Sequence, residues 1–583
     1  MMKLMQRRLL GVIALLCIQQ QIIAQAFIHL QQPTREQNNV NSARQFLAGR
    51  TCKSCTLRIN NDSIYVYPTG TFAVKRELGT GRTAFTLTAT DTLTRSSATR
   101  QVVYYYHPLP PAKATPVFKI DHFSISPGGH LQVTEGDTLR IKMKAFPGCK
   151  ATWINNMPLR ELPPAQCGGV PGCYEGLYVV KASDSLLNGR ITIRLKDSQG
   201  HATSRQSPHT YRFLPNNGLF TGRTIDNMTY LTAAARGDRL GPEKTGYLDK
   251  GVLLHISGRE DNYYKVRLSA RHSAYIPEAL VDTATLAEPS PVSIITQARV
   301  WADDQYDYVS VPLADKLPYL STQEVRPGRI IVDVYGAYAE EGLSAQLGST
   351  REIQRVAWQQ VEPEVFRIVI DLQHAFPWGY QLYYEGNTLT VKIKPTPASL
   401  RLRDLTIGLD AGHGGRNVGA RGLTGTYEKE MTLTISQLLK AALEKEGATV
   451  LTTRTREQYV ANEDRLVYFR RTQPDLLLSI HLNASANPVD ISGTATYYKH
   501  PFCEPLARAI YNRMLETGLS SFGCNGGFNF ILNNPTAFPD VLIETLFLSH
   551  PADEARVLDP DFRELMVQKI IQGLKDFLEE AGK

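Results

Sequence analysis

The sequence lacks several features that would assign it to a class at once. Beyond residue 26, no apolar run approaches the ~20 residues that a bilayer-spanning helix needs, so no later segment is expected to cross a membrane. No run rich in Lys and Arg is present, and a net charge of +8 is small for 583 residues, which excludes nucleic acid as a partner. The CxxC pattern occurs once, at Cys52 and Cys55, so a zinc ribbon with two such pairs is excluded.

Residues 1–26 have the layout of a secretory signal peptide. Basic residues precede the apolar run Leu9–Ile18, and the small residues Ala24 and Ala26 follow it. A membrane anchor is the alternative, but the apolar run is shorter than the ~20 residues that a bilayer span needs. We therefore predict export to the periplasm or cell envelope, with the signal peptide removed.

Cysteine is also scarce, with eight residues in the chain. Cys17 belongs to the signal peptide, which leaves seven. In an oxidising compartment these are expected to form disulfides, with one cysteine unpaired by parity. Because Cys52 and Cys55 lie in a strand-rich, helix-poor region, a thioredoxin-like role for this pair is disfavoured.

The length predicts several domains, and the first part of the chain predicts short strands separated by turns. The segment that contains INNDSIYVYPTGTFAVKREL resembles an immunoglobulin-like module, and the segment that ends in YKVRLS and AYIP resembles a bacterial SH3-like barrel. The predicted domains are an Ig-like module at 27–112, a β-rich module at 118–215, an SH3-like barrel at 219–290, a β domain at 292–396, and a C-terminal domain at 400–583.

The periodicity changes at about residue 400, where strands begin to alternate with helices. The apolar stripe of the helix Glu428–Glu446 ends before Gly447, a typical helix stop. The strand sequences LLLSI and VLIETLFL are apolar on both sides, as in a sheet that is buried on two faces. This pattern predicts an α/β domain with a mostly parallel sheet flanked by helices.

Four side chains of this domain are candidates for catalysis. His413 lies in the loop GHGG after the strand Leu405–Leu409, Glu428 opens the next helix, and His481 ends a later strand. In such folds ligands bind at the carboxyl ends of the strands, so these groups are expected to converge. Two imidazoles and one carboxylate, with one position open, make a catalytic zinc site, and zinc lowers the pKa of water toward ~7.

Glu544 stands within the apolar strand VLIETLFL, where a carboxylate is costly unless it is paired or functional. Next to the metal it is predicted to act as general base and then as general acid. Each candidate also has a structural explanation, such as the helix dipole for Glu428. Two further roles stay open. Asp410 either supports an imidazole or is structural, and Asn483 either contacts substrate or satisfies the loop backbone.

The C-terminal domain resembles the zinc-dependent N-acetylmuramoyl-L-alanine amidases of the amidase_3 type. The motifs that carry the resemblance are GLDAGHGG, GTYEKEMTLTISQLLKAAL, VLTTRT, DLLLSIHLNA, SGTATYY and VLIETLFLSH. The resemblance implies that His413, Glu428 and His481 bind zinc and that Glu544 is the catalytic glutamate. The loop departs from the family, because Asn417 and Val418 stand where an Asp-Pro pair is usual.

The predicted function is therefore that of an exported zinc hydrolase, which cleaves the amide between N-acetylmuramic acid and L-alanine of peptidoglycan. Residues 292–396 resemble the β domains that precede such amidases, and the β modules are expected to position the enzyme. The alternatives are a peptidoglycan-binding scaffold protein, another zinc peptidase, or a non-haem iron oxygenase with the same donor set. Substrate-binding residues are not predicted, and an envelope regulatory protein is a candidate partner.

Overall fold

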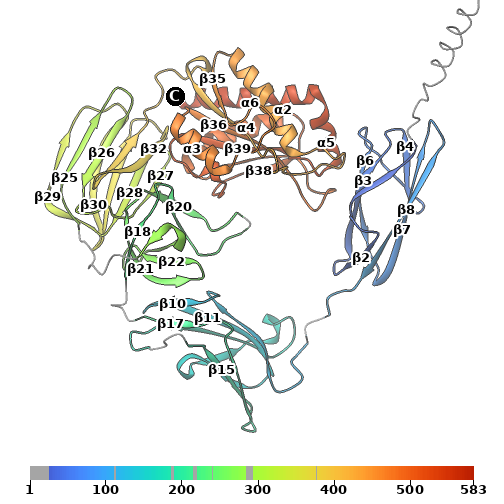
Figure 1. Ribbon diagram of the computed structural model, residues 1–583, viewed down its shortest axis with the longest axis horizontal. Helices are drawn as coiled ribbons and strands as arrows, with labels where there is room; N and C mark the ends of the chain where they lie inside the picture. The colour runs from blue at the N-terminus through green and yellow to red at the C-terminus, as the bar shows by residue number, and fades with distance from the viewer. Residues whose placement is uncertain are drawn as a thin grey trace, which may run out of the picture.

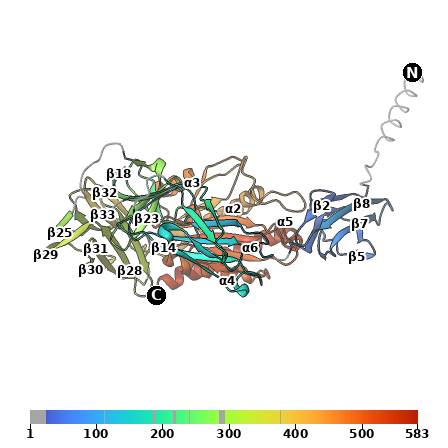
Figure 2. The ribbon, with the colours of Figure 1, turned by 90° about the horizontal axis from the view of Figure 1, so that it is seen from below.

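The computed structural model describes residues 25–110, 113–184, 189–214, 220–238, 240–283, 293–375 and 377–583. All but the last two residues of the predicted signal peptide lie outside these ranges. Figures 1 and 2 show that the chain curves back, so that its first module lies beside the C-terminal domain. Within the described ranges, no helix has the length and apolar character to cross a membrane.

The first module, residues 25–110, consists of two facing sheets. Alternation along GRTAFTLTATD directs Phe85, Leu87 and Ala89 inward, where they meet Leu47 and Phe72 of the other sheet. One sheet contains β1 (Ile28–Gln32), β3 (Arg44–Thr51) and β6 (Thr71–Glu77). The other contains β2 (Gln37–Val40), β4 (Cys55–Ile59), β5 (Asp62–Ile64), β7 (Gly81–Asp91) and β8 (Ser97–Tyr106).

The second module, residues 118–214, contributes a seven-stranded sheet. Its core surrounds Trp153, which packs edge-on against Tyr178. The strands are β9 (Ile120–Ser126), β11 (Thr138–Ala145), β12 (Lys150–Thr152), β13 (Pro158–Glu161), β14 (Cys173–Val179), β15 (Thr192–Lys196) and β16 (Ala202–Gln206). Two short strands, β10 (Leu131–Val133) and β17 (Tyr211–Phe213), belong to the sheet of the next module instead.

The third module, residues 220–283, therefore shares a nine-stranded sheet with its neighbour, across the boundary that the sequence pattern predicts. Leu131 of β10 pairs with Glu260 of β21. The third module's own strands are β18 (Phe220–Thr224), β19 (Thr229–Thr232), β20 (Lys244–Leu248), β21 (Leu253–Glu260), β22 (Tyr263–Arg267), β23 (Ser273–Pro277) and β24 (Val281–Asp282). The strand β20 lies at an edge of this sheet.

The fourth module, residues 293–396, contains two sheets that share one apolar core with the third module. The first sheet contains β25 (Ser293–Ala302), β26 (Asp307–Pro312), β29 (Ala337–Leu347), β32 (Tyr380–Glu385) and β33 (Thr388–Ile393). The second contains β27 (Tyr319–Glu324), β28 (Arg329–Tyr335), β30 (Ile353–Glu362) and β31 (Val365–Leu372). This module is fixed to the C-terminal domain, since Trp378 stacks on Phe577 and Tyr380 N donates to Thr536 O at 2.7 Å.

The C-terminal domain, residues 400–583, has the predicted α/β architecture. Its sheet has the order β35-β34-β36-β39-β37-β38, and only the β37–β39 pair is antiparallel. The strands are β34 (Thr406–Ala411), β35 (Thr449–Thr452), β36 (Leu476–Asn483), β37 (Thr494–Tyr497), β38 (Ser521–Asn525) and β39 (Asp540–Phe547). The sequence pattern predicts strands at residues 405–409, 449–453, 476–481, 494–498 and 541–547, which correspond to all of these strands except β38.

Helices pack on this sheet through apolar stripes. Ile435, Leu439 and Leu443 of the first helix are buried in the same core as Ile407 and Leu478 of the strands. The α-helices are α2 (Glu428–Lys445), α3 (Asn462–Thr472), α4 (Glu504–Leu515), α5 (Pro551–Leu558) and α6 (Pro560–Ala581). The short helix α5 is not predicted from the sequence pattern.

The cysteine prediction is wrong in its number of free thiols. Disulfides join Cys52 to Cys55 and Cys167 to Cys173. The described part of the chain leaves three free cysteines rather than one: Cys149, Cys503 and Cys524. Cys503 is buried, and its thiol lies 3.5 Å from a carboxylate oxygen of Asp540. This thiol therefore contacts a carboxylate rather than another cysteine.

Candidate metal centre and cleft

The loop after β34 turns sharply and presents His413. Its φ of +61° lies in the left-handed region, which is uncommon for a residue with a side chain. Gly412 lies under the ring of His481, where a Cβ atom would come within 2.4 Å of the imidazole. A glycine is therefore required at this position for the two histidines to approach each other.

Three of the four predicted site residues converge on one point. The carboxylate oxygen Oε1 of Glu428 lies 3.1 Å from His413 Nε2 and 3.0 Å from His481 Nδ1. The donor atoms of the three side chains all lie within 4.8 Å of one another, and the two imidazole rings meet edge-on. Residues that are far apart in sequence meet because β34 and β36 are parallel neighbours, and α2 begins at the same end of the sheet.

The carboxylate of Glu428 is held in place by backbone groups as well. Its Oε2 accepts from Ala420 N at 2.7 Å, and its Oε1 accepts from Leu482 N at 3.0 Å. Burial would raise the pKa of Glu428, but hydrogen bonds from the two imidazoles outweigh it and lower the pKa. The side chain is therefore a fixed anion at the centre of the cluster.

Asn417 orients the first imidazole. His413 Nδ1 lies 2.9 Å from Asn417 Oδ1, so the ring donates to this amide and turns Nε2 toward the cluster. The sequence marks this residue only as a departure from the family pattern. The structure gives the departure a role, because the asparagine side chain supports the histidine directly.

Two buried arginines hold the backbone of the loop, and the sequence analysis does not assign them a role. Arg465 donates to Ala411 O at 2.8 Å and to His413 O at 2.5 Å. Arg454 donates to Ala411 O and Gly412 O, both at 2.9 Å. In the sequence, Arg465 stands on the helix Asn462–Thr472 and Arg454 in the motif VLTTRT, which is a weak signal. Their almost complete burial, which is rare for arginine, is seen only in the structure.

The remaining candidates lie around the same cluster. Glu544 is the register partner of His481 on the adjacent strand β39 and lines the same cavity. Asp410 is structural, because its carboxylate accepts from Arg465, Thr453 and Ser479. Asn483 lines the cavity, and its side chain accepts from Ala484 N at 2.8 Å.

The cluster and Glu544 open into a cavity of about 400 Å³. One wall is apolar and comes from the segment Phe530–Leu532 of the C-terminal domain together with Leu240 of the third module. Asn529 joins these parts, since its side chain donates to Pro242 O at 2.8 Å and accepts from Lys244 N at 3.2 Å. A β module thus contributes directly to the cleft, which the sequence does not predict.

The donor set fits a catalytic zinc ion. Two imidazole nitrogens and one carboxylate oxygen match the ligands of known catalytic sites with an open fourth position. The supporting contact from Asn417 is of the kind that metal-binding histidines need. The cavity in front of the cluster leaves space for a substrate beside Glu544.

Comparisons with known proteins identify two parts of the chain. Residues 407–576 match the Amidase_3 family, described as N-acetylmuramoyl-L-alanine amidase, and residues 297–393 match the AMIN domain. The probable cell wall amidase LytH of Staphylococcus aureus is 36% identical over 176 residues, which are 30% of this chain and 58% of LytH. The chain thus spans a little over half the length of the curated relatives that it matches.

Solved structures with detectable similarity each cover 30% of this chain. An N-acetylmuramoyl-L-alanine amidase from Clostridium difficile 630 is 28% identical and covers 30% of this chain and 97% of its own, with a TM-score of 0.29. The catalytic domain of CwlV from Bacillus (Paenibacillus) polymyxa var. colistinus is 28% identical and covers 30% of this chain and 98% of its own, also with a TM-score of 0.29. The family matches thus identify an Amidase_3 domain at residues 407–576, which an AMIN domain at residues 297–393 precedes.

Proposed function

We propose that this protein is an exported zinc amidase that cleaves the bond between N-acetylmuramic acid and L-alanine in peptidoglycan. The observation that carries the proposal is the convergence of His413, Glu428 and His481 within 4.8 Å at a cavity that Glu544 also lines. The family match supplies the bond, since the matched family is described as N-acetylmuramoyl-L-alanine amidase.

The proposed roles follow from position. His413, Glu428 and His481 would hold zinc, which when bound polarises a carbonyl and lowers the pKa of water. Glu544, beside His481 on the next strand, takes the proton from the attacking water and returns it to the leaving nitrogen. Asn417 holds the His413 ring, and Arg465 holds the backbone that carries it.

The cellular setting is part of the proposal. The N-terminal sequence favours export, and an AMIN domain with an amidase domain favours the cell envelope and its peptidoglycan. The Ig-like and SH3-like assignments of the first and third modules rest on sequence resemblance alone. A regulatory protein of the envelope stays a prediction from the sequence.

The test is digestion of purified sacculi by the full mature chain, with mass spectrometry of the released products. We expect free stem peptides that begin with L-alanine, and loss of this activity on chelation with recovery on added zinc. Glu544→Gln is expected to lower the rate by about 10²- to 10⁴-fold and to keep the bound zinc, because it removes only the proton transfer.

The matched control is Glu564→Gln, which changes an exposed glutamate of the same domain and should leave the rate unchanged. Products cut within the stem peptide would instead indicate another zinc peptidase. Binding to sacculi without any product would indicate a scaffold protein, and full activity of Glu544→Gln would refute the role of this carboxylate.

A further inference from the structure

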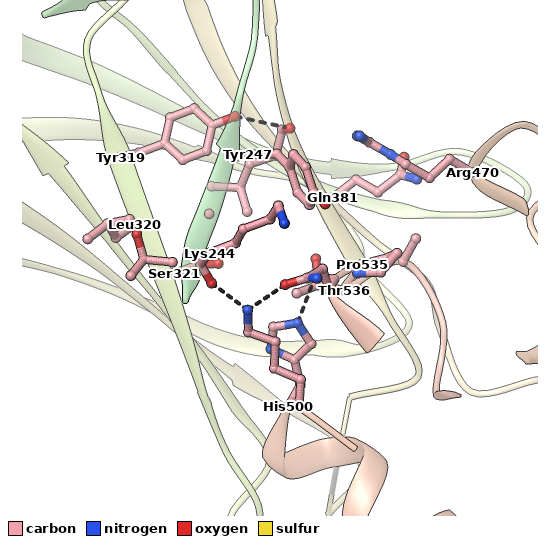
Figure 3. Close-up of a pocket in the computed structure, with 16 residues that line it drawn as sticks. Lys244, Tyr247, Tyr319, Leu320, Ser321, Gln381, Arg470, His500, Pro535 and Thr536 are labelled. Atoms are coloured by element: carbon pink, nitrogen blue, oxygen red, sulfur yellow. Dashed lines mark hydrogen bonds between the residues drawn. The ribbon is translucent and has the colours of Figure 1, made fainter. Parts of the chain in front are cut away.

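A second cavity lies where three parts of the molecule meet. It has a volume of about 70 Å³ and lies between the edge strands β20 of the third module and β27 of the AMIN domain. The C-terminal domain closes it with residues 499–500 and 534–537. Figure 3 shows Lys244, Tyr247 and Arg470 around the same space as Pro535 and Thr536.

The described residues that line this cavity carry an excess of positive charge. Lys244, Arg470 and Lys499 line it, whereas none of its described lining residues is Asp or Glu. The contacts that the described residues make with these cations are to uncharged groups: Lys499 to Asn534 Oδ1, Arg470 to Met228 Sδ, and Lys244 to the ring of Tyr230. Arg470 lies over the ring of Tyr247, with 5.7 Å between the guanidinium carbon and the ring centre. Cations gathered in a partly buried space are costly unless an anion accompanies them.

The lowered pKa values of the two lysines reflect this cost of burial. Burial lowers the pKa of Lys499 to about 8, although Glu243 and Asp540 act from a distance in the opposite sense. Burial also lowers the pKa of Lys244, with Glu463 opposing it. Lys499 donates to Lys244 O and to Asn534 Oδ1, which are neutral acceptors. At pH 7 the Lys499 ammonium therefore remains charged, and its hydrogen-bond partners among the described residues are neutral.

Hydroxyl groups provide a second, independent observation. Thr245 Oγ1 and Tyr247 Oη are buried, and neither has a hydrogen-bond partner among the described residues. Both residues line the cavity. Burial raises the pKa of Tyr247 to about 12, so the phenol stays protonated and is a donor. Buried polar groups without partners are rare in folded proteins, and an ion or water that completes them is the usual explanation.

We propose that this junction cavity binds a small oxyanion, either a phosphate or a carboxylate group. Lys244, Arg470 and Lys499 supply the charge, and the hydroxyls of Thr245 and Tyr247 donate hydrogen bonds. Because its walls come from three parts of the chain, the bound anion stabilises their docking. The site is separate from the metal cluster, since the two cavities share no described lining residue.

The test is thermal unfolding of the full mature chain at pH 7 and fixed ionic strength, with chloride replaced stepwise by phosphate or by acetate. We expect a saturable rise in the midpoint with at least one of the two anions. A response to phosphate alone identifies a phosphate group, and a response to acetate alone identifies a carboxylate. Equal midpoints in all three salts would overturn the proposal.

Substitutions in the junction cavity distinguish anion binding there from anion binding at the metal cluster. Lys244→Gln should weaken the apparent anion affinity by about tenfold or more, because it removes one charge-assisted contact. The matched control Lys250→Gln changes an exposed lysine of the same module and should respond like the wild type. An unchanged response of Lys244→Gln would place the anion elsewhere and refute the site.

Tyr247→Phe distinguishes a ligand contact from a structural one. The variant keeps the ring under Arg470 and removes only the hydroxyl. In chloride its midpoint should equal or exceed that of the wild type, because an unsatisfied buried group is lost. In phosphate or acetate its rise should be smaller than that of the wild type. A full rise in this variant would exclude the phenol from the site.

Discussion

The loop between β34 and α2, residues 412–427, is held in two different ways along its length. The half that carries His413 is fixed by charged groups of its own domain. Arg465 pairs with buried Asp410 at 2.5 Å and donates to His413 O, and Arg454 donates to Gly412 O. Both arginine side chains are almost fully buried, and hydrogen bonds from charged groups are strong, so this half is expected to be the more rigid.

The half that leads to Glu428 is held by a buried carboxylate of α5 and by side chains of the first module. Glu554 of α5 is fully buried and accepts from Leu423 N at 3.0 Å and Thr424 N at 2.9 Å. Arg50 of the first module donates to Thr424 O at 2.6 Å, and Gln31 donates to Arg421 O at 3.0 Å. This half therefore joins the metal cluster to the N-terminal module.

The contacts of the first half stabilise the C-terminal domain, whereas those of the second half connect the metal cluster to the first module. The charged half depends on contacts inside the C-terminal domain, whose removal leaves a buried charge. The half that leads to Glu428 depends partly on exposed contacts, which are weak individually but connect two modules at opposite ends of the sequence. Breaking each half is therefore expected to have effects of different size and kind.

The largest effect is expected for Arg465→Ala. It leaves the carboxylate of Asp410 buried without its counter-ion, which costs about 3–5 kcal/mol. The measurement is the urea midpoint of the C-terminal domain transition, with Arg471→Ala as the control because Arg471 is exposed on the same helix. A loss below about 1 kcal/mol would mean that this network does not secure the loop.

An intermediate effect is expected for Glu554→Gln, about 1–3 kcal/mol, because an amide cannot accept from all three donors. Burial raises the pKa of Glu554, and hydrogen bonds from Thr424 only partly oppose this. A raised pKa in the folded state contributes stability that is present below the unfolded pKa and is lost as pH rises through the folded pKa. The loss in free energy of unfolding caused by Glu554→Gln should thus be larger at pH 4.5 than at pH 8. Urea unfolding at the two pH values measures this loss, and the reverse order would refute a raised pKa of Glu554.

The smallest effect is expected at the contact with the first module. Lys75 and Asp490 form an ion pair at 3.1 Å, with side chains 39% and 42% exposed. Such pairs contribute about 0.2–1 kcal/mol, and salt should weaken them. A double-mutant cycle with Lys75→Ala and Asp490→Ala, at low and high salt, measures this coupling. A coupling above about 2 kcal/mol would show that the first module is held as firmly as the charged half of the loop.

The sequence was sufficient to predict the α/β domain and the meeting of three candidate ligands. Both follow from one rule, because loops after neighbouring parallel strands share an edge of the sheet. His413, Glu428 and His481 lie together as this rule predicts, and their binding of zinc stays a proposal. Strand β38 and helix α5 were missed, since each is short and follows a turn without a clear periodic pattern.

Contacts between distant residues could not be predicted. Arg454 and Arg465 resemble surface charges in the sequence, because their partners are mostly backbone carbonyls of the loop 411–413. The pairing of β10 with β21 crosses a predicted boundary, since three residues carry too little pattern to assign a strand to a sheet. Parity misled the cysteine prediction in the same way, as it says nothing about distance.

Leu240 of the third module completes the apolar wall that Phe530 begins. An excised amidase domain would therefore expose that flank to solvent, and a chimera with a foreign upstream module would fill it differently. The shape offered to a substrate thus depends on which module stands upstream. Under the proposed function, exchange of the upstream module would change what enters the cavity while His413, Glu428, His481 and Glu544 stay unaltered.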